Sequence, residues 1–205
     1  MRRWLLSLTS LLPGVLAAIA APAASAWTAS NALPCAPRTE AQVFRPWGDT
    51  STWFLGPNGS FSSSLSTTWA TVGVVDTPAE NEPWNVSGAS TARSVRLAPG
   101  AQIWMRPICV TATEDRIRAF VKRPGIIASS LKMVAVSWNP RTLRYLETPI
   151  WISGTAPGWT PTPVVQMTDF TNSTGTQLLG VYFVNEGLGS WQIDDVYVDP
   201  FKCCG

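Results

Sequence analysis

The chain contains no histidine. Histidine is the side chain best suited to exchanging protons near neutral pH, and it is the commonest metal ligand. Its absence excludes Ser-His-Asp and Cys-His nucleophilic sites, His-Glu-x-x-His metalloproteases and zinc sites with histidine ligands. Any catalysis would therefore depend on carboxylate, tyrosine, lysine or arginine side chains.

Charge is also scarce, because Asp, Glu, Lys and Arg make up only 14% of the residues and no basic run occurs. Fifteen basic residues stand against 13 acidic ones, and Arg2 and Arg3 lie in an N-terminal segment that we expect to be removed. The remaining chain then has no formal net charge. This composition predicts neither a nucleic acid nor an anionic membrane surface as a partner, since both attract clustered Lys and Arg.

The N-terminus has the pattern of a secretory signal peptide. Arg2 and Arg3 precede an apolar run that Pro13 and Gly14 interrupt, and Ala24-Ser25-Ala26 supplies the small residues before a cleavage site. The interrupted run falls short of the roughly 20 apolar residues that a membrane span needs. We therefore predict residues 1–26 as signal peptide and a secreted, extracellular protein without a membrane span in the mature chain.

The mature length suits one domain. We predict an N-terminal arm over residues 27–40, one domain over 41–202 and a cysteine-containing tail over 203–205. Short segments of alternating polar and apolar residues recur between turn residues such as Pro99-Gly100, and no long helical period occurs. This pattern predicts an all-β antiparallel sandwich, with strands that include residues 42–47, 69–75, 131–138, 142–147 and 150–153.

Two blocks resemble the galactose-binding-like jelly roll that many carbohydrate-binding modules use. Residues 59–69, Gly-Ser-Phe-Ser-Ser-Ser-Leu-Ser-Thr-Thr-Trp, are similar to the opening block of that family, and Ile193-Asp194-Asp195-Val196 is similar to its closing strand. The resemblance implies a single-domain jelly roll and a glycan ligand. Blocks such as Asn81-Glu82-Pro83 are also similar to those of short secreted bacterial proteins of unknown function.

In that family a structural calcium ion often joins the two end blocks. Ser62 stands where the family has a glutamate, which removes one anionic ligand. Strict alternation along the closing strand would place Asp194 with Val196 and Val198, and Asp195 with Tyr197, so that only one carboxylate points inward. Asp194 is the metal candidate, and a salt bridge or a loop-capping role is the favoured alternative.

Ten tryptophans remain after the signal peptide, and exposed indoles commonly stack on sugar rings. Trp84 and Trp159 lie in turn-rich segments, and Trp104 and Trp151 lie between polar neighbours in predicted strands. These four are predicted to form a ligand-binding platform, with Gln102 and Arg106 as partners for sugar hydroxyl groups. Burial in the core is the alternative for each tryptophan.

The sequence thus predicts a non-catalytic binding domain for polysaccharide or cell-envelope glycan. A secreted structural or protein-interaction factor is the second hypothesis. An enzyme that cleaves glycans with two carboxylates is the third, since such chemistry needs no histidine. The sequence leaves the oligomeric state undetermined.

Four cysteines in an exported chain indicate disulfide bonds, and four cysteines allow three complete pairings. We favour Cys35 with Cys109, because Cys203 and Cys204 lie on the tail after the last predicted strand. Those two could form a strained vicinal pair, bond to another chain or remain thiols.

Overall fold

The computed structural model describes residues 38–88, 92–111, 114–125, 127, 129–139, 142, 144–153, 157–167 and 176–199. The predicted signal peptide, Cys35, Cys203 and Cys204 lie outside these residues. Within them, no helix is long and apolar enough to cross a membrane.

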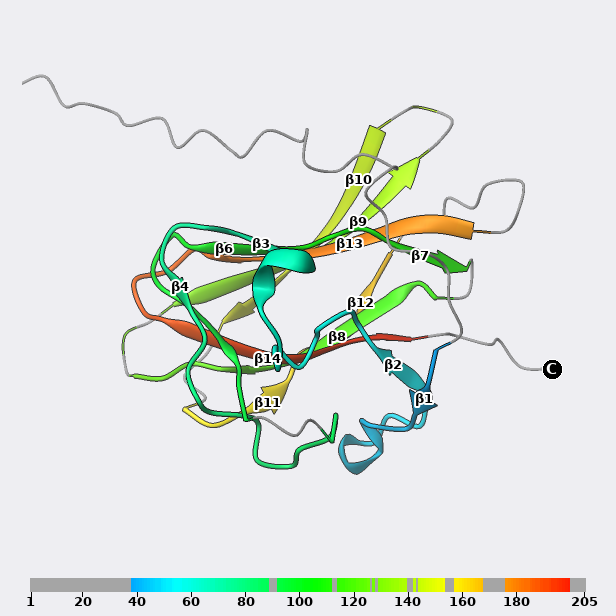
Figure 1. Ribbon diagram of the computed structural model, residues 1–205. Helices are drawn as coiled ribbons and strands as arrows, with labels where there is room; N and C mark the ends of the chain where they lie inside the picture. The colour runs from blue at the N-terminus through cyan, green and yellow to red at the C-terminus, as the bar shows by residue number, and fades with distance from the viewer. Residues whose placement is uncertain are drawn as a thin grey trace, which may run out of the picture.

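The fold is an antiparallel β-sandwich, as the sequence predicts, and Figure 1 shows its two layers one above the other. The eight-stranded sheet, below, contains β1 (Glu40–Ala41), β2 (Trp53–Leu55), β4 (Val75–Asp76), β5 (Val95–Leu97), β8 (Arg116–Lys122), β11 (Thr160–Pro161), β12 (Val165–Gln166) and β14 (Trp191–Asp199). The six-stranded sheet, above, contains β3 (Trp69–Val72), β6 (Gln102–Met105), β7 (Ile108–Thr111), β9 (Ser130–Asn139), β10 (Arg144–Ser153) and β13 (Thr176–Asn185).

The main core fills the space between the two sheets. Alternate residues of each strand point into it, such as Ile103 and Met105 of β6 and Val181 and Phe183 of β13, and all four are fully buried. Each large apolar side chain buried in this way contributes roughly 1.5–3 kcal/mol. The opposite residues of the same strands therefore face the two outer sides of the sandwich.

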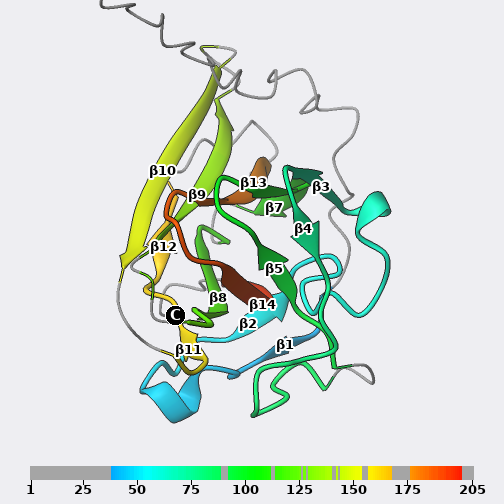
Figure 2. The same cartoon turned by 90° about the vertical axis from the view of Figure 1, so that its left-hand side faces the viewer.

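The long β9–β10 hairpin extends beyond the other strands of the six-stranded sheet (Figure 2). The sequence predicts two separate strands here, over 142–147 and 150–153, and that prediction is wrong because β10 runs unbroken from Arg144 to Ser153. Pro149 lies inside it. A proline is tolerated there because β10 pairs only with β9 on its sheet path, and the outer side of an edge strand needs no N–H donor.

Two further strand predictions are wrong in part. Residues 45–47 form a short 3₁₀ helix, η3 (Arg45–Trp47), because Pro46 suits the first helical turn and Gly48, at a φ of 82°, ends it. The run predicted over 69–75 is divided into β3 and β4 at Gly73, whose φ of 77° turns the chain. A second 3₁₀ helix, η4 (Leu65–Thr67), precedes β3.

A second, smaller cluster covers the outer face of the eight-stranded sheet. It consists of Phe44, Trp53, Phe120, Trp159 and Tyr197, all buried. The rings of Phe44 and Phe120 stack with their centroids 5.2 Å apart. The segment around η3 therefore packs onto this sheet.

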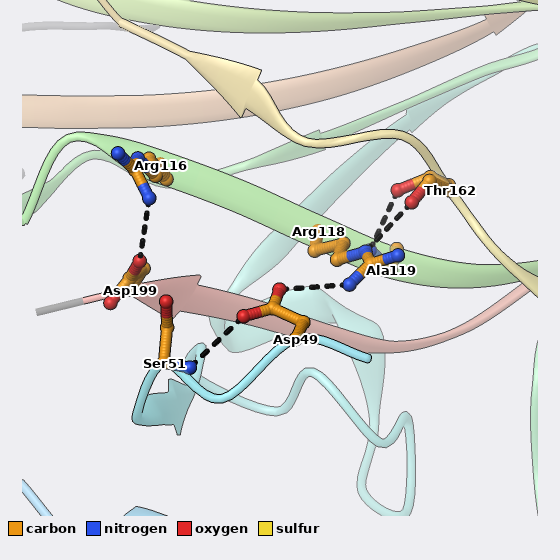
Figure 3. A network of polar contacts seen from close by, with 7 residues as sticks. All are labelled: Asp49, Ser51, Arg116, Arg118, Ala119, Thr162 and Asp199. Carbon is orange, nitrogen blue, oxygen red and sulfur yellow. Dashed lines mark hydrogen bonds and ion pairs between the residues drawn. The ribbon is translucent and has the colours of Figure 1, made fainter. Parts of the chain in front are cut away.

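Polar contacts fasten the same segment in place (Figure 3). Arg118 of β8 donates to Asp49 Oδ2 at 2.9 Å and to the Thr162 carbonyl at 2.8 Å. Its guanidinium also lies over the Phe44 ring, 4.6 Å from the centroid. Burial lowers the pKa of Arg118, and the Asp49 carboxylate acts against that effect. One arginine thus holds segments from two distant parts of the sequence against β8.

Candidate functional site

The outer face of the six-stranded sheet brings together four of the six predicted ligand-binding residues. Gln102, Trp104 and Arg106 follow one another on the same side of β6 and its extension, because side chains two residues apart share a face. Strand pairing places Trp151 on that face too, through the row Trp151, Lys132, Val184 and Gln102.

Trp104 stacks against the ring of a tyrosine on the neighbouring strand. It stacks on Tyr182 of β13 with centroids 3.8 Å apart and an angle of 18° between the planes, and its indole N–H donates to Gln102 Oε1 at 3.1 Å. On the other side, Trp104 pairs across the strands with Ala70 of β3. Tyr182 thus covers one face of the indole, and the two stacked rings form one aromatic unit on this side of the sheet.

Trp151 is a more exposed indole at the β10 edge, with 56% of its surface accessible. Its N–H donates to Glu186 Oε2 at 2.9 Å, and the Lys132 ammonium lies 5.6 Å from the ring centroid. These contacts hold the ring in one orientation. A fixed, exposed aromatic ring binds a ligand with little loss of conformational entropy.

Tyr182 links the centre of this face to β10. Its hydroxyl group donates to Glu147 Oε2 at 3.0 Å. Burial, reinforced by the nearby Glu147 charge, raises the pKa of the Tyr182 phenol, so that it remains a hydrogen-bond donor at neutral pH. Among the residues that the structure describes, this face carries two carboxylates, Glu147 and Glu186, and two cations, Lys132 and Arg106, and these four charges balance.

The six ligand-binding residues predicted from the sequence do not include Tyr182, Lys132 or Glu147, although all three lie on this face. The alternation over residues 131–138 already indicates a strand with two different faces. The two-residue period of that strand is therefore enough to assign Lys132 to the face opposite Leu131 and Met133. Tyr182 and Glu147 required knowledge of which strands are neighbours, and period does not supply it.

Trp84 and Trp159 lie on the opposite side of the molecule. Trp159 is 9% exposed and belongs to the cluster on the eight-stranded sheet, whereas Trp84 is 47% exposed and packs on Trp47 and Phe120. The prediction of one platform with four tryptophans is therefore wrong. The two layers of the sandwich separate the indoles into two pairs.

The closing strand also differs from its prediction. A β-bulge between Asp194 and Tyr197 interrupts the pairing of β14 with β8, and Asp195 adopts a left-handed φ of 46°. Val196 and Val198 consequently face the core together with Ile193, while neither aspartate does. Strict alternation is wrong here because the bulge inserts a residue, and both carboxylates end beneath the loop formed by residues 80–88.

The favoured alternative for Asp194, a loop-capping role, is what the structure shows. Asp194 Oδ2 accepts from the Glu82 N–H at 3.0 Å, and Asp194 Oδ1 accepts from the Asp195 N–H at 2.8 Å. Glu82 in turn accepts from the N–H groups of Trp84 and Val86, both at 2.6 Å. Asp195 Oδ2 accepts from the Ser87 N–H at 3.2 Å.

This donor set does not fit a calcium ion. Calcium takes six to eight oxygen ligands, and both oxygens of Asp194 already receive backbone N–H groups, whose positive ends would face the ion. Across the described residues, no three His, Cys, Asp or Glu side chains are grouped to hold a metal. We therefore derive no role for calcium at Asp194.

The carboxyl groups under the loop are strongly perturbed. Burial, with the neighbouring Asp195 charge adding to it, raises the pKa of Asp194 to about 9. Burial also raises the pKa of Asp195 to about 7, although its hydrogen bonds to Ser87 act in the opposite direction. Each group is fully buried, so the neutral acid is favoured over an isolated charge.

Cys109 is half-buried on β7, opposite Leu178 of β13. Because Cys35 lies outside the described residues, the Cys35–Cys109 disulfide stays a prediction.

Two hollows lie away from Trp104 and Trp151. One of about 420 Å³ is lined by residues of the β9–β10 hairpin end, including Arg144 and Tyr145, and one of about 500 Å³ lies between the Ser62–Ser64 run and Asp76. Neither hollow is lined by Trp104 or Trp151. On the face that carries these rings, Val134, Val136 and Tyr182 form a buried cluster against which Trp104 packs.

No family model and no curated protein sequence matches the chain. Among solved structures, it is similar to the CBM22-1-GH10 modules of Clostridium thermocellum endo-1,4-β-D-xylanase 10B, complexed with xylohexaose (12% identity, 69% of this chain and 27% of that chain, TM-score 0.47). It is also similar to TmCBM61 in complex with β-1,4-galactotriose (16% identity, 70% and 96%, TM-score 0.45). A third similar structure is the CBM22-1 xylan-binding domain of Paenibacillus barcinonensis Xyn10C (16% identity, 69% and 90%, TM-score 0.46). Carbohydrate-binding modules of β-sandwich type are thus among the solved structures that this chain resembles.

Proposed function

We propose that this protein binds a neutral polysaccharide chain across the outer face of its six-stranded sheet. The observation that carries the proposal is the arrangement of Gln102, Trp104 and Arg106 in one line on β6, with Trp151 on the same face. Aromatic rings supply the apolar surface that sugar rings stack on, and the amide and guanidinium groups supply hydrogen bonds to hydroxyl groups.

The geometry favours an extended ligand. Trp104 and Trp151 lie three strands apart, which at about 4.8 Å per strand separates their strands by about 14 Å. A single sugar ring cannot contact both indoles at that spacing, whereas a chain of sugar residues can. The balanced charges on this face favour a neutral chain over a polyanion.

Affinity gel electrophoresis tests the proposal with soluble xylan, β-1,4-galactan and mixed-linkage β-1,3-1,4-glucan in the gel. We expect at least one polysaccharide to retard the protein, and Trp104→Ala or Trp151→Ala to weaken the retardation at least tenfold. Trp138→Ala, on the same sheet but next to Tyr145, is the matched control. No retardation by any of the three polysaccharides, or unchanged retardation of both variants, would contradict the proposal.

We also propose that the mature protein is exported, does not catalyse a reaction and acts on polysaccharide or cell-envelope glycan outside the cell. The signal-peptide pattern supports export, and the lack of histidine supports a binding role. Mass spectrometry of the culture medium should find a mature N-terminus at Trp27 and a Cys35–Cys109 disulfide. Retention of residues 1–26 in the exported protein would contradict cleavage after Ala26.

A further inference from the structure

Hydrogen bonds to buried carboxyl groups hold the backbone of the loop over residues 80–88. Four of its backbone N–H groups, those of Glu82, Trp84, Val86 and Ser87, donate to carboxyl groups that are buried. Burying carboxyl groups is costly unless they are hydrogen-bonded. The chain therefore uses three acidic side chains, Glu82, Asp194 and Asp195, to fix the backbone of one loop.

The large apolar side chain that this loop presents to solvent is Trp84. Its ring meets Trp47 edge-on with centroids 4.8 Å apart, and it lies 5.6 Å from the Phe120 ring. Trp47 belongs to η3, which the polar contacts of Figure 3 hold against β8 through Arg118 and Asp49. The indole is thus supported from beneath by rigid elements, yet 47% of its surface remains exposed.

Hydrogen-bonding groups lie on the same outer face of the eight-stranded sheet. Lys122, two residues beyond Phe120 on β8, pairs with Glu80, and Gln192 donates to the second Glu80 oxygen at 3.0 Å. The Lys122 ammonium also lies 5.8 Å from the Trp159 ring centroid. Trp84 packs on Phe120, and Lys122 with its paired Glu80 follows Phe120 on the same side of β8, so this face offers both an apolar ring and partners for hydroxyl groups, as a sugar ring requires.

We infer that Trp84, with Lys122 and Glu80, forms a second glycan-binding surface, and that the protein bridges two polysaccharide chains through its opposite faces. The bridging rests on the proposed function of the six-stranded sheet. Trp104 and Trp84 lie on the outer sides of two sheets with the main core between them, so each surface takes its own chain. A bivalent protein of this kind cross-links polymers without catalysis and gains avidity from both contacts.

The test compares wild-type protein, Trp84→Ala and the double variant Trp104→Ala/Trp151→Ala. Affinity electrophoresis in xylan, galactan and mixed-linkage glucan gels measures binding, and dynamic light scattering of the same dissolved polysaccharide measures cross-linking. We expect wild-type protein to increase the hydrodynamic radius at least twofold. Each variant should still be retarded, but neither should increase the radius.

Trp84→Phe keeps an aromatic ring on the same supports and should retain part of the cross-linking, which separates a contact role from a folding role. An unchanged increase in radius with Trp84→Ala would overturn the inference. If the double variant loses all retardation, Trp84 does not bind glycan, and only the site on the six-stranded sheet stands.

If Trp84→Ala alone loses retardation, the proposed function of the six-stranded sheet fails, and bridging fails with it. If none of the three polysaccharides retards wild-type protein, both proposals are overturned.

Discussion

Replacing Asp195 with asparagine should stabilise the protein relative to wild type, and this difference in the free energy of unfolding should grow as the pH rises. Asp195 is fully buried, and its Oδ1 has no hydrogen-bond donor. The carboxamide of Asp195→Asn keeps an oxygen for the Ser87 N–H and brings N–H groups toward Glu82. Asparagine also tolerates the left-handed φ of 46° at this bulge.

The magnitude follows from proton linkage. Asp195 has a pKa of about 7 in the folded protein, against about 3.9 in the unfolded chain. Its contribution to stability is therefore fully present below about pH 4 and is lost as the pH rises through about 7, because the unfolded chain releases a proton that the folded protein retains. The loss is about 1.4 kcal/mol for each pH unit below the folded pKa and levels off above it, which amounts to about 2 kcal/mol between pH 5 and pH 7 and about 3 kcal/mol by pH 8.

Asparagine carries no such proton, so this dependence should disappear from the variant. Urea unfolding, followed by tryptophan fluorescence between about pH 5 and about pH 8, measures the free energy of unfolding of both proteins. The difference, variant minus wild type, should rise by about 3 kcal/mol over this range. Asp76→Asn, at an exposed ion pair with Arg96, is the control for a change of charge. A difference that stays constant with pH would refute the reasoning.

Three further outcomes test a close backbone contact, a buried hydrogen-bonded side chain and the response of the protein to calcium. Gly59→Ala should lower the free energy of unfolding by about 2 kcal/mol or more, because a Cβ there would lie 2.6 Å from the Val196 carbonyl oxygen. At Gly158 a Cβ would have no atom within 4 Å, so Gly158→Ala should change the free energy of unfolding by less than about 0.5 kcal/mol. Asn185→Asp should lower the free energy of unfolding by about 3 kcal/mol or more in chemical denaturation, since the Asn185 amide donates to the Leu97 and Gly189 carbonyls and a carboxylate cannot. An effect no larger than that of Asn81→Asp, at a partly exposed position, would argue against this. The melting temperature should be the same in chelator and in excess calcium chloride, and a rise on adding calcium would restore a metal role for Asp194.

The all-β architecture could be predicted because it depends on local patterns. Period-two alternation places Met133 and Ala135 on one side of β9 and Val134 and Val136 on the other, and the structure keeps that division. The alignment of Gln102, Trp104 and Arg106 follows from the same rule, since all three belong to one short segment. Predictions of this kind need only the geometry of an extended chain.

Other features depended on contacts between distant segments. Trp84 and Trp104 lie on the same face only if their segments pack on the same sheet. Both segments are rich in turn residues or polar neighbours, so local sequence does not show which sheet each one packs on. The bulge at Asp195 is stabilised by the 80–88 loop, more than 100 residues earlier in the chain, so alternation within the closing strand could not reveal it.

The sequence alone determined the class of fold, the absence of histidine chemistry and the abundance of indole rings, because these follow from composition and from the two-residue period of strands. Only the tertiary structure decided that the exposed rings divide between two opposite faces and that Asp194 and Asp195 cap a loop. The physical reason is that a sheet places side chains on its two sides by local geometry, whereas the packing of two sheets and the loops that cover them is set by contacts between residues far apart in the chain.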